Sequence, residues 1–154
     1  MDQGLQFLDS CLSKNNMLLT VIDKRHILIE VKKSISQAKK EIIATMLLSE
    51  EIKKPLPKSY FNLINNKVKQ DIVFKRLGFG KEEDYNKIRQ KLFIRESNYI
   101  FKYNSKESRY QRLIIIDRQT LFFGADKLFF KCIHKPLIDI FLRYFYINFK
   151  KGKI

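Results

Sequence analysis

The stretch from residue 108 to residue 124 constrains the fold of this chain more than any other part of the sequence. It contains the apolar run from Leu113 to Ile116, a short polar segment, and a second apolar run that ends at Gly124. β-Branched and aromatic runs bounded by turn residues are typical of buried strands. We therefore predict a hairpin over residues 112–123 with Asp117 at its turn, and we expect the function to depend on the residues at the mouth of this hairpin.

Five further segments carry apolar residues at helical spacing, which predicts amphipathic helices. These helices are predicted over residues 4–12, 24–40, 58–68, 82–92 and 137–149. Asp23 is placed to cap the second of them, and Pro136 stands where the last one can start.

Three short apolar runs predict strands inside a sheet. They cover residues 41–48, 70–77 and 98–103. We expect residues 78–80 to end the second strand, and residues 49–57 and 127–133 to be connecting segments. Residues 17–22 fit either a strand or the entry to the next helix.

The order of these elements predicts an α/β fold in which helices flank a mixed sheet. A length of 154 residues and an apolar content of 45% suit one domain with one core. We divide the chain into an N-terminal helix or connector (1–23), the α/β domain (24–149) and a basic, frayed tail (150–154).

The final predicted helix is apolar almost all round. Such a helix is either buried on all sides or has one side against a partner. The aromatic residues Phe141, Tyr144 and Phe145 are therefore candidates for the interface of a homodimer, with simple burial in the core as the alternative.

The charge of the chain is strongly positive. It has 31 Lys and Arg residues against 16 Asp and Glu residues, which gives a net charge of +15. A field this positive attracts polyanions such as DNA, RNA or anionic lipid. Contact with nucleic acid is one interpretation, and a set of solvated lysines spread along the chain is the other.

Further features of the sequence concern the cellular compartment and the absence of motifs for a metal or a cofactor. The longest nearly apolar stretch, residues 42–48, is far shorter than the roughly 20 residues that cross a bilayer. No basic region followed by an apolar stretch opens the chain, and Cys11 and Cys132 stand alone, so we expect a cytoplasmic protein with reduced thiols. Since His26 and His134 have no partners at ligand spacing, we predict neither a metal site nor a cofactor.

Four features together resemble one half of the phospholipase D-like fold, and in particular the effector domains of archaeal TrmB-type transcriptional regulators. They are a helix that runs straight into the first strand (35–43), the strand at 71–77, the hairpin at 112–123 and the aromatic final helix around 140–145. The resemblance covers residues 24–149 and implies this fold together with a regulatory role.

The resemblance also points to the catalytic motif of that fold, which is His-x-Lys, four residues, then Asp. In the family, the His is the nucleophile and the Lys holds the phosphate. Aligned on Asp117, this chain has Tyr110 at the position of the His and Arg112 at the position of the Lys. A phenol with a pKa near 10 needs a strongly activating neighbour, and the sequence shows none. We therefore predict no catalytic residue.

An arginine can still bind phosphate or carboxylate through two parallel hydrogen bonds. Arg109, Tyr110, Arg112 and Asp117 are therefore the candidates for a site that binds a small anionic ligand. The alternative is structural: Asp117 accepts hydrogen bonds from turn amides, and the arginines are solvated.

The preferred function is a non-catalytic sensor or dimerisation module of a regulatory, transcription-related protein. The alternatives are an atypical phosphodiesterase or nuclease, and a protein that binds nucleic acid without chemistry. The segment before Lys24 is too short for the usual three-helix DNA-binding unit, so we expect any such unit to lie on another chain or segment.

Overall fold

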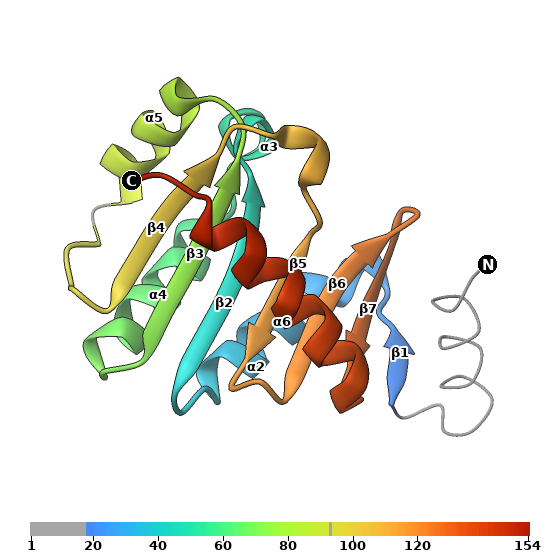
Figure 1. The fold of residues 1–154 in the computed structure, drawn as a ribbon. Helices are drawn as coiled ribbons and strands as arrows, with labels where there is room; N and C mark the ends of the chain where they lie inside the picture. The colour runs from blue at the N-terminus through green and yellow to red at the C-terminus, as the bar shows by residue number, and fades with distance from the viewer. Residues whose placement is uncertain (1–17, 93) are drawn as a thin grey trace.

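A seven-stranded mixed sheet forms the middle layer of the molecule (Figure 1). The computed structural model describes residues 18–92 and 94–154. In spatial order the strands are β1 (Leu19–Val21), β7 (Leu128–Cys132), β6 (Thr120–Ala125), β5 (Leu113–Ile116), β2 (Glu41–Leu47), β3 (Val73–Phe79) and β4 (Tyr99–Asn104). β2, β3 and β4 run parallel, and the other neighbouring strands are antiparallel. The predicted mixed α/β fold is confirmed.

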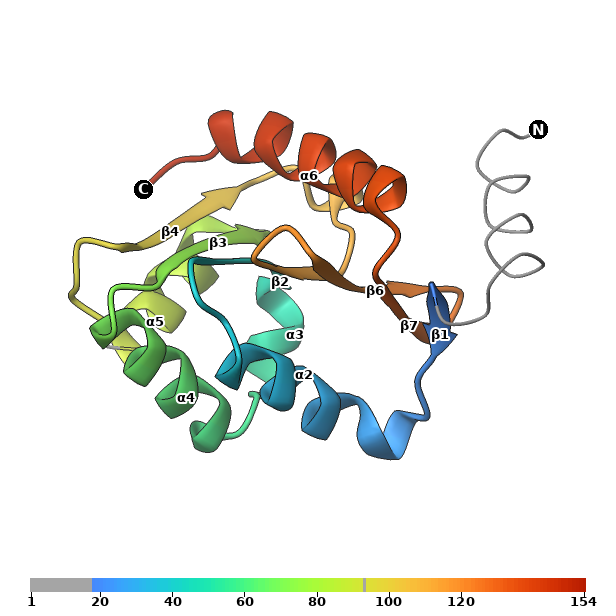
Figure 2. The same ribbon diagram turned by 90° about the horizontal axis from the view of Figure 1, so that it is seen from below.

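Helices cover both faces of this sheet. They are η1 (a 3₁₀ helix, Lys24–His26), α2 (Ile27–Ser36), α3 (Leu48–Lys53), α4 (Lys58–Lys69), α5 (Glu82–Leu92), η2 (a 3₁₀ helix, Glu107–Arg109) and α6 (Lys135–Lys150). Figure 2 shows α6 on one side of the sheet and α2, α3, α4 and α5 on the other. The protein is therefore a three-layer sandwich.

β2 is an interior strand of the sheet, which pairs with β3 on one side and with β5 on the other. Ile42, Ile43 and Ala44 are buried in succession along it, because both faces of the strand are covered. The predicted hairpin is also confirmed as β5 and β6, which pair from Leu113 opposite Phe123 to Ile116 opposite Thr120.

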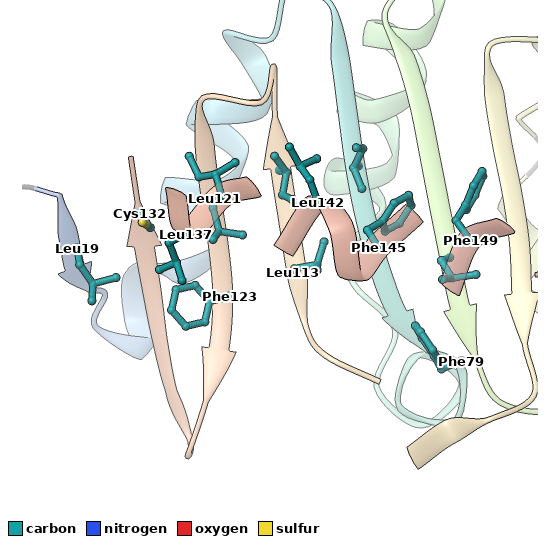
Figure 3. Packing of buried hydrophobic residues seen from close by; sticks show 14 residues of the cluster. Leu19, Phe79, Leu113, Leu121, Phe123, Cys132, Leu137, Leu142, Phe145 and Phe149 are labelled. Atoms are coloured by element: carbon teal, nitrogen blue, oxygen red, sulfur yellow. The ribbon is translucent and has the colours of Figure 1, made fainter. Parts of the chain in front are cut away.

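One cluster of buried apolar residues lies between α6 and the sheet (Figure 3). Phe145 and Phe149 stack at 5.1 Å between ring centroids and pack against Leu77 and Phe79 in one cluster. Phe145 has an exposed fraction of 0%. Its prediction as an interface residue is therefore wrong, because the helix turns this side chain toward its own sheet.

Two predicted connections are regular elements. Residues 128–132 form β7, which pairs with β6 through a tight turn at Asp126 and Lys127. Both turn residues have positive φ (52° and 65°), the left-handed geometry of a hairpin turn, although neither is Gly or Asn. The predicted loop at 49–57 begins with α3, a short helix that ends before Pro55.

β3 runs on through the predicted break at Gly78. A side chain at this position would meet a neighbour, since a Cβ would lie 2.5 Å from Cδ2 of Leu48. The absence of a side chain lets α3 approach the sheet here. Gly78 is therefore a packing residue inside the strand, and Gly80, with φ at 142°, follows the end of the strand.

Both ends of the described chain join the sheet. β1 pairs with β7, and Asp23 caps η1 by accepting a hydrogen bond from the Arg25 amide at 2.9 Å. At the other end, the amide and carbonyl of Lys153 each bond to Tyr103 at 2.8 Å, so the expectation of a frayed tail is wrong. The predicted helix at 4–12 and Cys11 lie outside the described residues.

Candidate functional site

The four residues predicted to share a site lie in three different places. Tyr110 and Arg112 precede β5, whereas Asp117 follows it. At about 3.3 Å per residue, the strand separates Arg112 from Asp117 by roughly 16 Å. Arg109 lines a separate hollow. The structure therefore does not bring Asp117 or Arg109 together with the other two residues.

Asp117 has a structural role. Its carboxylate accepts hydrogen bonds from the amides of Lys39 (2.8 Å), Lys40 (2.8 Å) and Glu41 (2.9 Å), in the segment that leads into β2. Burial by itself would raise the pKa of Asp117, but these three amide donors outweigh it, and the pKa lies below its ordinary value of 3.8. The residue therefore joins the β5–β6 turn to the start of β2.

Tyr110 and Arg112 line a cavity of about 290 Å³ beside the carboxyl end of β2. In sheets with parallel strands, ligands commonly bind at this end of the strands. The apolar part of the wall is Ile27, Leu28, Val31, Met46, Leu56 and Phe129, with smaller contributions from β2 and β5. The polar part is Lys24, Thr45, Glu50, Glu51, Lys54, Tyr60, Arg76, Tyr110 and Arg112. We call this space the Arg76 cavity.

At the mouth of the Arg76 cavity, Arg112 bonds to two neighbouring side chains. Arg112 pairs with the Glu50 carboxylate and also donates from Nε to the Tyr110 hydroxyl at 3.3 Å. Burial raises the pKa of Tyr110, although Arg112 acts in the opposite direction. The phenol is therefore protonated at neutral pH, and the position that holds the nucleophilic His in the motif holds a weak nucleophile instead.

Arg76 projects from β3 into the interior of the site. Its exposed fraction is 1%, and its guanidinium carbon lies 4.9 Å from the centroid of the Phe74 ring and 5.4 Å from that of Phe61. Among the described residues, Nε and Nη2 have no hydrogen-bond partner. A buried guanidinium in this state is exceptional, because buried charges in proteins are normally paired and hydrogen-bonded.

The surroundings keep this guanidinium charged. Burial opposes the charge, but the phenols of Tyr99 and Tyr60 and the Glu51 carboxylate favour it, so the pKa of Arg76 is raised. Glu51 itself accepts a hydrogen bond from the Leu56 amide at 3.2 Å, and burial raises its pKa. Glu51 therefore favours the charge without forming an ion pair with Arg76.

The sequence did carry a signal for Arg76. The residue stands in a predicted strand, two positions after Phe74 and two before Gly78, so all three share one face of the sheet. Because that face is covered, an Arg in this register is a charge in the interior. The periodicity predicted the strand, and the register of its charged residues would have shown which of them is buried.

The hollow that contains Arg109 is smaller and basic. Its volume is about 200 Å³, and its lining includes Lys106, Arg109, Lys151 and Lys153 but no acidic residue. The pairing of Lys153 with Tyr103 brings the tail to this place.

The described residues contain no group of three or more His, Cys, Asp and Glu side chains that could hold a metal ion. Within residues 18–92 and 94–154, no helix is long and apolar enough to cross a membrane.

Comparison with known proteins identifies the fold. No family model and no curated protein sequence matches the chain. Among solved structures, the chain is similar to TrmBL2, described as an archaeal chromatin protein with a novel mode of DNA binding, with a TM-score of 0.68 and 14% identity over 98% of this chain. The chain has the phospholipase D-like fold. It spans 60% of the length of TrmBL2.

Two bacterial phospholipase D-like structures support the same fold. NucT from Helicobacter pylori matches with a TM-score of 0.62 and 14% identity, over 88% of this chain and 96% of NucT. Nuc from Salmonella typhimurium, described as a phospholipase D family member, matches with a TM-score of 0.65 and 13% identity, over 88% of this chain and 97% of Nuc. Together with TrmBL2, they confirm the predicted phospholipase D-like fold close to TrmB-type proteins.

Proposed function

We propose that this chain is a non-catalytic regulatory module that binds a small anionic ligand in the Arg76 cavity. The observation that carries the proposal is the kind of side chain found at the His and Lys positions of the phospholipase D motif. Tyr110 stands in place of the nucleophilic His as a protonated phenol, and Arg112 is paired with Glu50 at the mouth of the cavity. These side chains suit binding, since a protonated phenol without a general base is a poor nucleophile.

The charges of the site support an anionic ligand. The wall holds the side chains of Lys24, Lys54, Arg76 and Arg112 against those of Glu50 and Glu51. The pair between Arg112 and Glu50 is about half exposed, and surface pairs of this kind contribute only about 0–1 kcal/mol. An incoming anion can therefore compete for Arg112 at the mouth before it reaches the buried guanidinium.

The proposal is tested by a cleavage assay with labelled single- and double-stranded DNA and RNA. We expect the wild-type chain and Tyr110→Phe to leave all four substrates intact. The matched control is Tyr144→Phe, which removes a phenol that bonds to the Arg109 carbonyl outside the cavity. Cleavage by the wild type that disappears in Tyr110→Phe and persists in Tyr144→Phe would refute the non-catalytic function.

A second candidate is contact with nucleic acid without chemistry. The net charge of +15 and the basic hollow around Lys106 and Arg109 favour it. The similarity in fold to TrmBL2, a protein described as DNA-binding, supports the same idea. It uses a different surface from the Arg76 cavity, so the two functions are compatible, and the salt dependence of binding tests it.

The proposal also includes the setting in which the module works. We place it in the cytoplasm, as a homodimer within a transcription-related system. The exposed residues Ile140 and Ile147 of α6, next to the half-buried Phe141 and Tyr144, provide the surface for self-association. Sedimentation of variants on this face tests the dimer.

A further inference from the structure

Arg76 is a buried charge whose hydrogen-bonding groups are not all satisfied by the described residues. It is 1% exposed, and its Nε and Nη2 atoms are buried without a hydrogen-bond partner among the described residues. The rings of Phe74 and Phe61 offset part of the charge through cation–π contacts. They offer no hydrogen-bond acceptor to the N–H groups. A carboxylate at these N–H groups would add an opposite charge as well as the hydrogen bonds that a water molecule could accept.

The positions of the unpartnered atoms indicate which acceptor fits. Nε and Nη2 lie on the same edge of the guanidinium plane, where two N–H bonds point in parallel. This edge matches the two oxygens of a carboxylate, which accept both bonds at once. Arg76 forms part of the wall of the cavity, so an acceptor that binds there lies beside its side chain.

The rest of the wall indicates the body of the ligand. Ile27, Leu28, Val31, Met46, Leu56 and Phe129 surround the space with apolar atoms. The polar groups of Thr45 are already engaged, because its hydroxyl donates to the Gln111 carbonyl at 2.6 Å and accepts from the Leu113 amide at 2.9 Å. A volume of about 290 Å³ equals the share of about ten water molecules in the liquid. The ligand is therefore small and mostly apolar.

We propose that the Arg76 cavity binds a small, mostly apolar monocarboxylate of about ten non-hydrogen atoms in all, and that the carboxylate pairs with Nε and Nη2 of Arg76. The inference rests on the proposed function and names the chemical class of its ligand. One negative charge matches the one buried cation of the wall, Arg76, which forms no ion pair with the described residues. The other cations of the wall either pair with Glu50 or lie at the exposed rim, as Lys24 and Lys54 do.

The test measures binding of four probes to the full chain by calorimetry and by thermal melting. Phenylacetate and octanoate are monocarboxylates of the expected size. Phenylacetamide has the same shape as phenylacetate without the charge, and phenyl phosphate carries a phosphate in place of the carboxylate. We expect both carboxylates to bind and to raise the melting temperature, and we expect phenylacetamide to bind at least tenfold more weakly than phenylacetate.

The matched variants are Arg76→Met and Arg143→Met. Arg143 is exposed on α6, on the other face of the sheet, so its loss should leave binding unchanged. Arg76→Met should weaken carboxylate binding at least tenfold. It should also melt at the same or a higher temperature than the wild type without ligand, because it removes an unpaired buried charge. If Arg76→Met does not fold, the comparison of phenylacetate with its amide on the wild-type chain decides the question.

Several outcomes would overturn the inference. They are equal binding of acid and amide, carboxylate binding that survives in Arg76→Met, and no binding of either carboxylate at millimolar concentration. Tighter binding of phenyl phosphate than of phenylacetate would refute the carboxylate and leave the proposed function in place. Cleavage of nucleic acid that depends on Tyr110 would refute the proposed function alone, since carboxylate binding is measured without turnover.

Discussion

Asp117 and Arg76 are charged residues with opposite surroundings. The Asp117 carboxylate accepts three amide hydrogen bonds and remains partly exposed. The Arg76 guanidinium is buried, and two of its nitrogen atoms lack a protein partner among the described residues. The first arrangement stabilises the native state, whereas an unsatisfied buried guanidinium costs stability.

The role of Asp117 predicts a pH-dependent loss of stability in Asp117→Asn. The pKa of the folded carboxyl is lowered, so its contribution is present above the unfolded value near 3.8 and is lost as the pH falls through the folded value. At pH 7 we expect the variant to lose about 1–3 kcal/mol of unfolding free energy, since hydrogen bonds to a charged group are replaced. Urea unfolding at pH 7, 5 and 3 measures this difference, which should shrink below pH 4.

The control for this measurement is Asp126→Asn. Asp126 has the same left-handed conformation in the β6–β7 turn, with φ at 52°, but no side-chain hydrogen bond in the described part of the chain. Its replacement should change stability little at any pH. An equal loss in both variants, or a loss in Asp117→Asn that stays constant down to pH 3, would contradict the role assigned to the three amide bonds.

At the scale of elements, α6 has one face that packs in the core and one face that is exposed to solvent. Leu142, Phe145 and Phe149 face the sheet and are buried, whereas Ile140 and Ile147 are about half exposed. Tyr144 lies between these groups, and burial raises its pKa to about 12 while its hydroxyl donates to the Arg109 carbonyl. Only the outer residues are available to another molecule.

If α6 forms the proposed dimer, Ile140→Asp combined with Ile147→Asp should convert it to a monomer. The melting temperature should stay within a few degrees, because exposed substitutions usually change stability by about 0.5 kcal/mol or less. The control is Phe145→Ala, which should cost about 3–5 kcal/mol of stability through the cavity it leaves. Sedimentation velocity at several concentrations gives the result. A wild-type monomer at high concentration, or a double variant that remains dimeric, would exclude this interface.

The elements that the sequence predicted are those with long or strongly patterned runs, such as β2, α4, α5 and the β5–β6 hairpin. β7 was missed because its turn, Asp126-Lys127, lacks the Gly or Asn that usually marks a two-residue hairpin. α3 was missed because Pro55 and Pro57 follow it closely, and prolines suggest a loop.

The candidate site was predicted only in part, because the tertiary structure decides which residues lie together. Tyr110 and Arg112 were found through the motif, and both line the cavity. Asp117 belongs to the same motif, but a strand of four residues carries it to the other end of the sheet. Arg76 and Glu50 come from segments far apart along the chain, and only the folded sheet brings them to the same cavity.

At the scale of the whole molecule, the positive field predicts binding of nucleic acid that weakens with salt. For a phosphate-driven mode, the logarithm of the binding constant falls linearly with the logarithm of salt concentration, with a slope of about −0.9 per phosphate contact. Lys106→Gln combined with Lys153→Gln removes two cations from the basic hollow. We expect this double variant to reduce the slope by about two, as measured by fluorescence anisotropy with labelled double-stranded DNA.

The control variant for this experiment carries the same change in net charge elsewhere. Lys33→Gln combined with Lys69→Gln alters exposed residues of α2 and α4, on the opposite face of the sheet from α6. Its slope should stay close to that of the wild type. An affinity that does not fall with salt, or an equal change of slope in both double variants, would show that the basic hollow does not bind nucleic acid through its phosphates.

The hydrogen bonds of Asp117 also bear on how the chain reaches its native state. They join residues 76 to 78 positions apart in the sequence, so they can form only after a long loop has closed and β2 has met β5. We infer that they belong to a late step of folding. Asp117→Asn should then accelerate unfolding more than it slows refolding in stopped-flow mixing, and the reverse partition would place this contact in the folding nucleus.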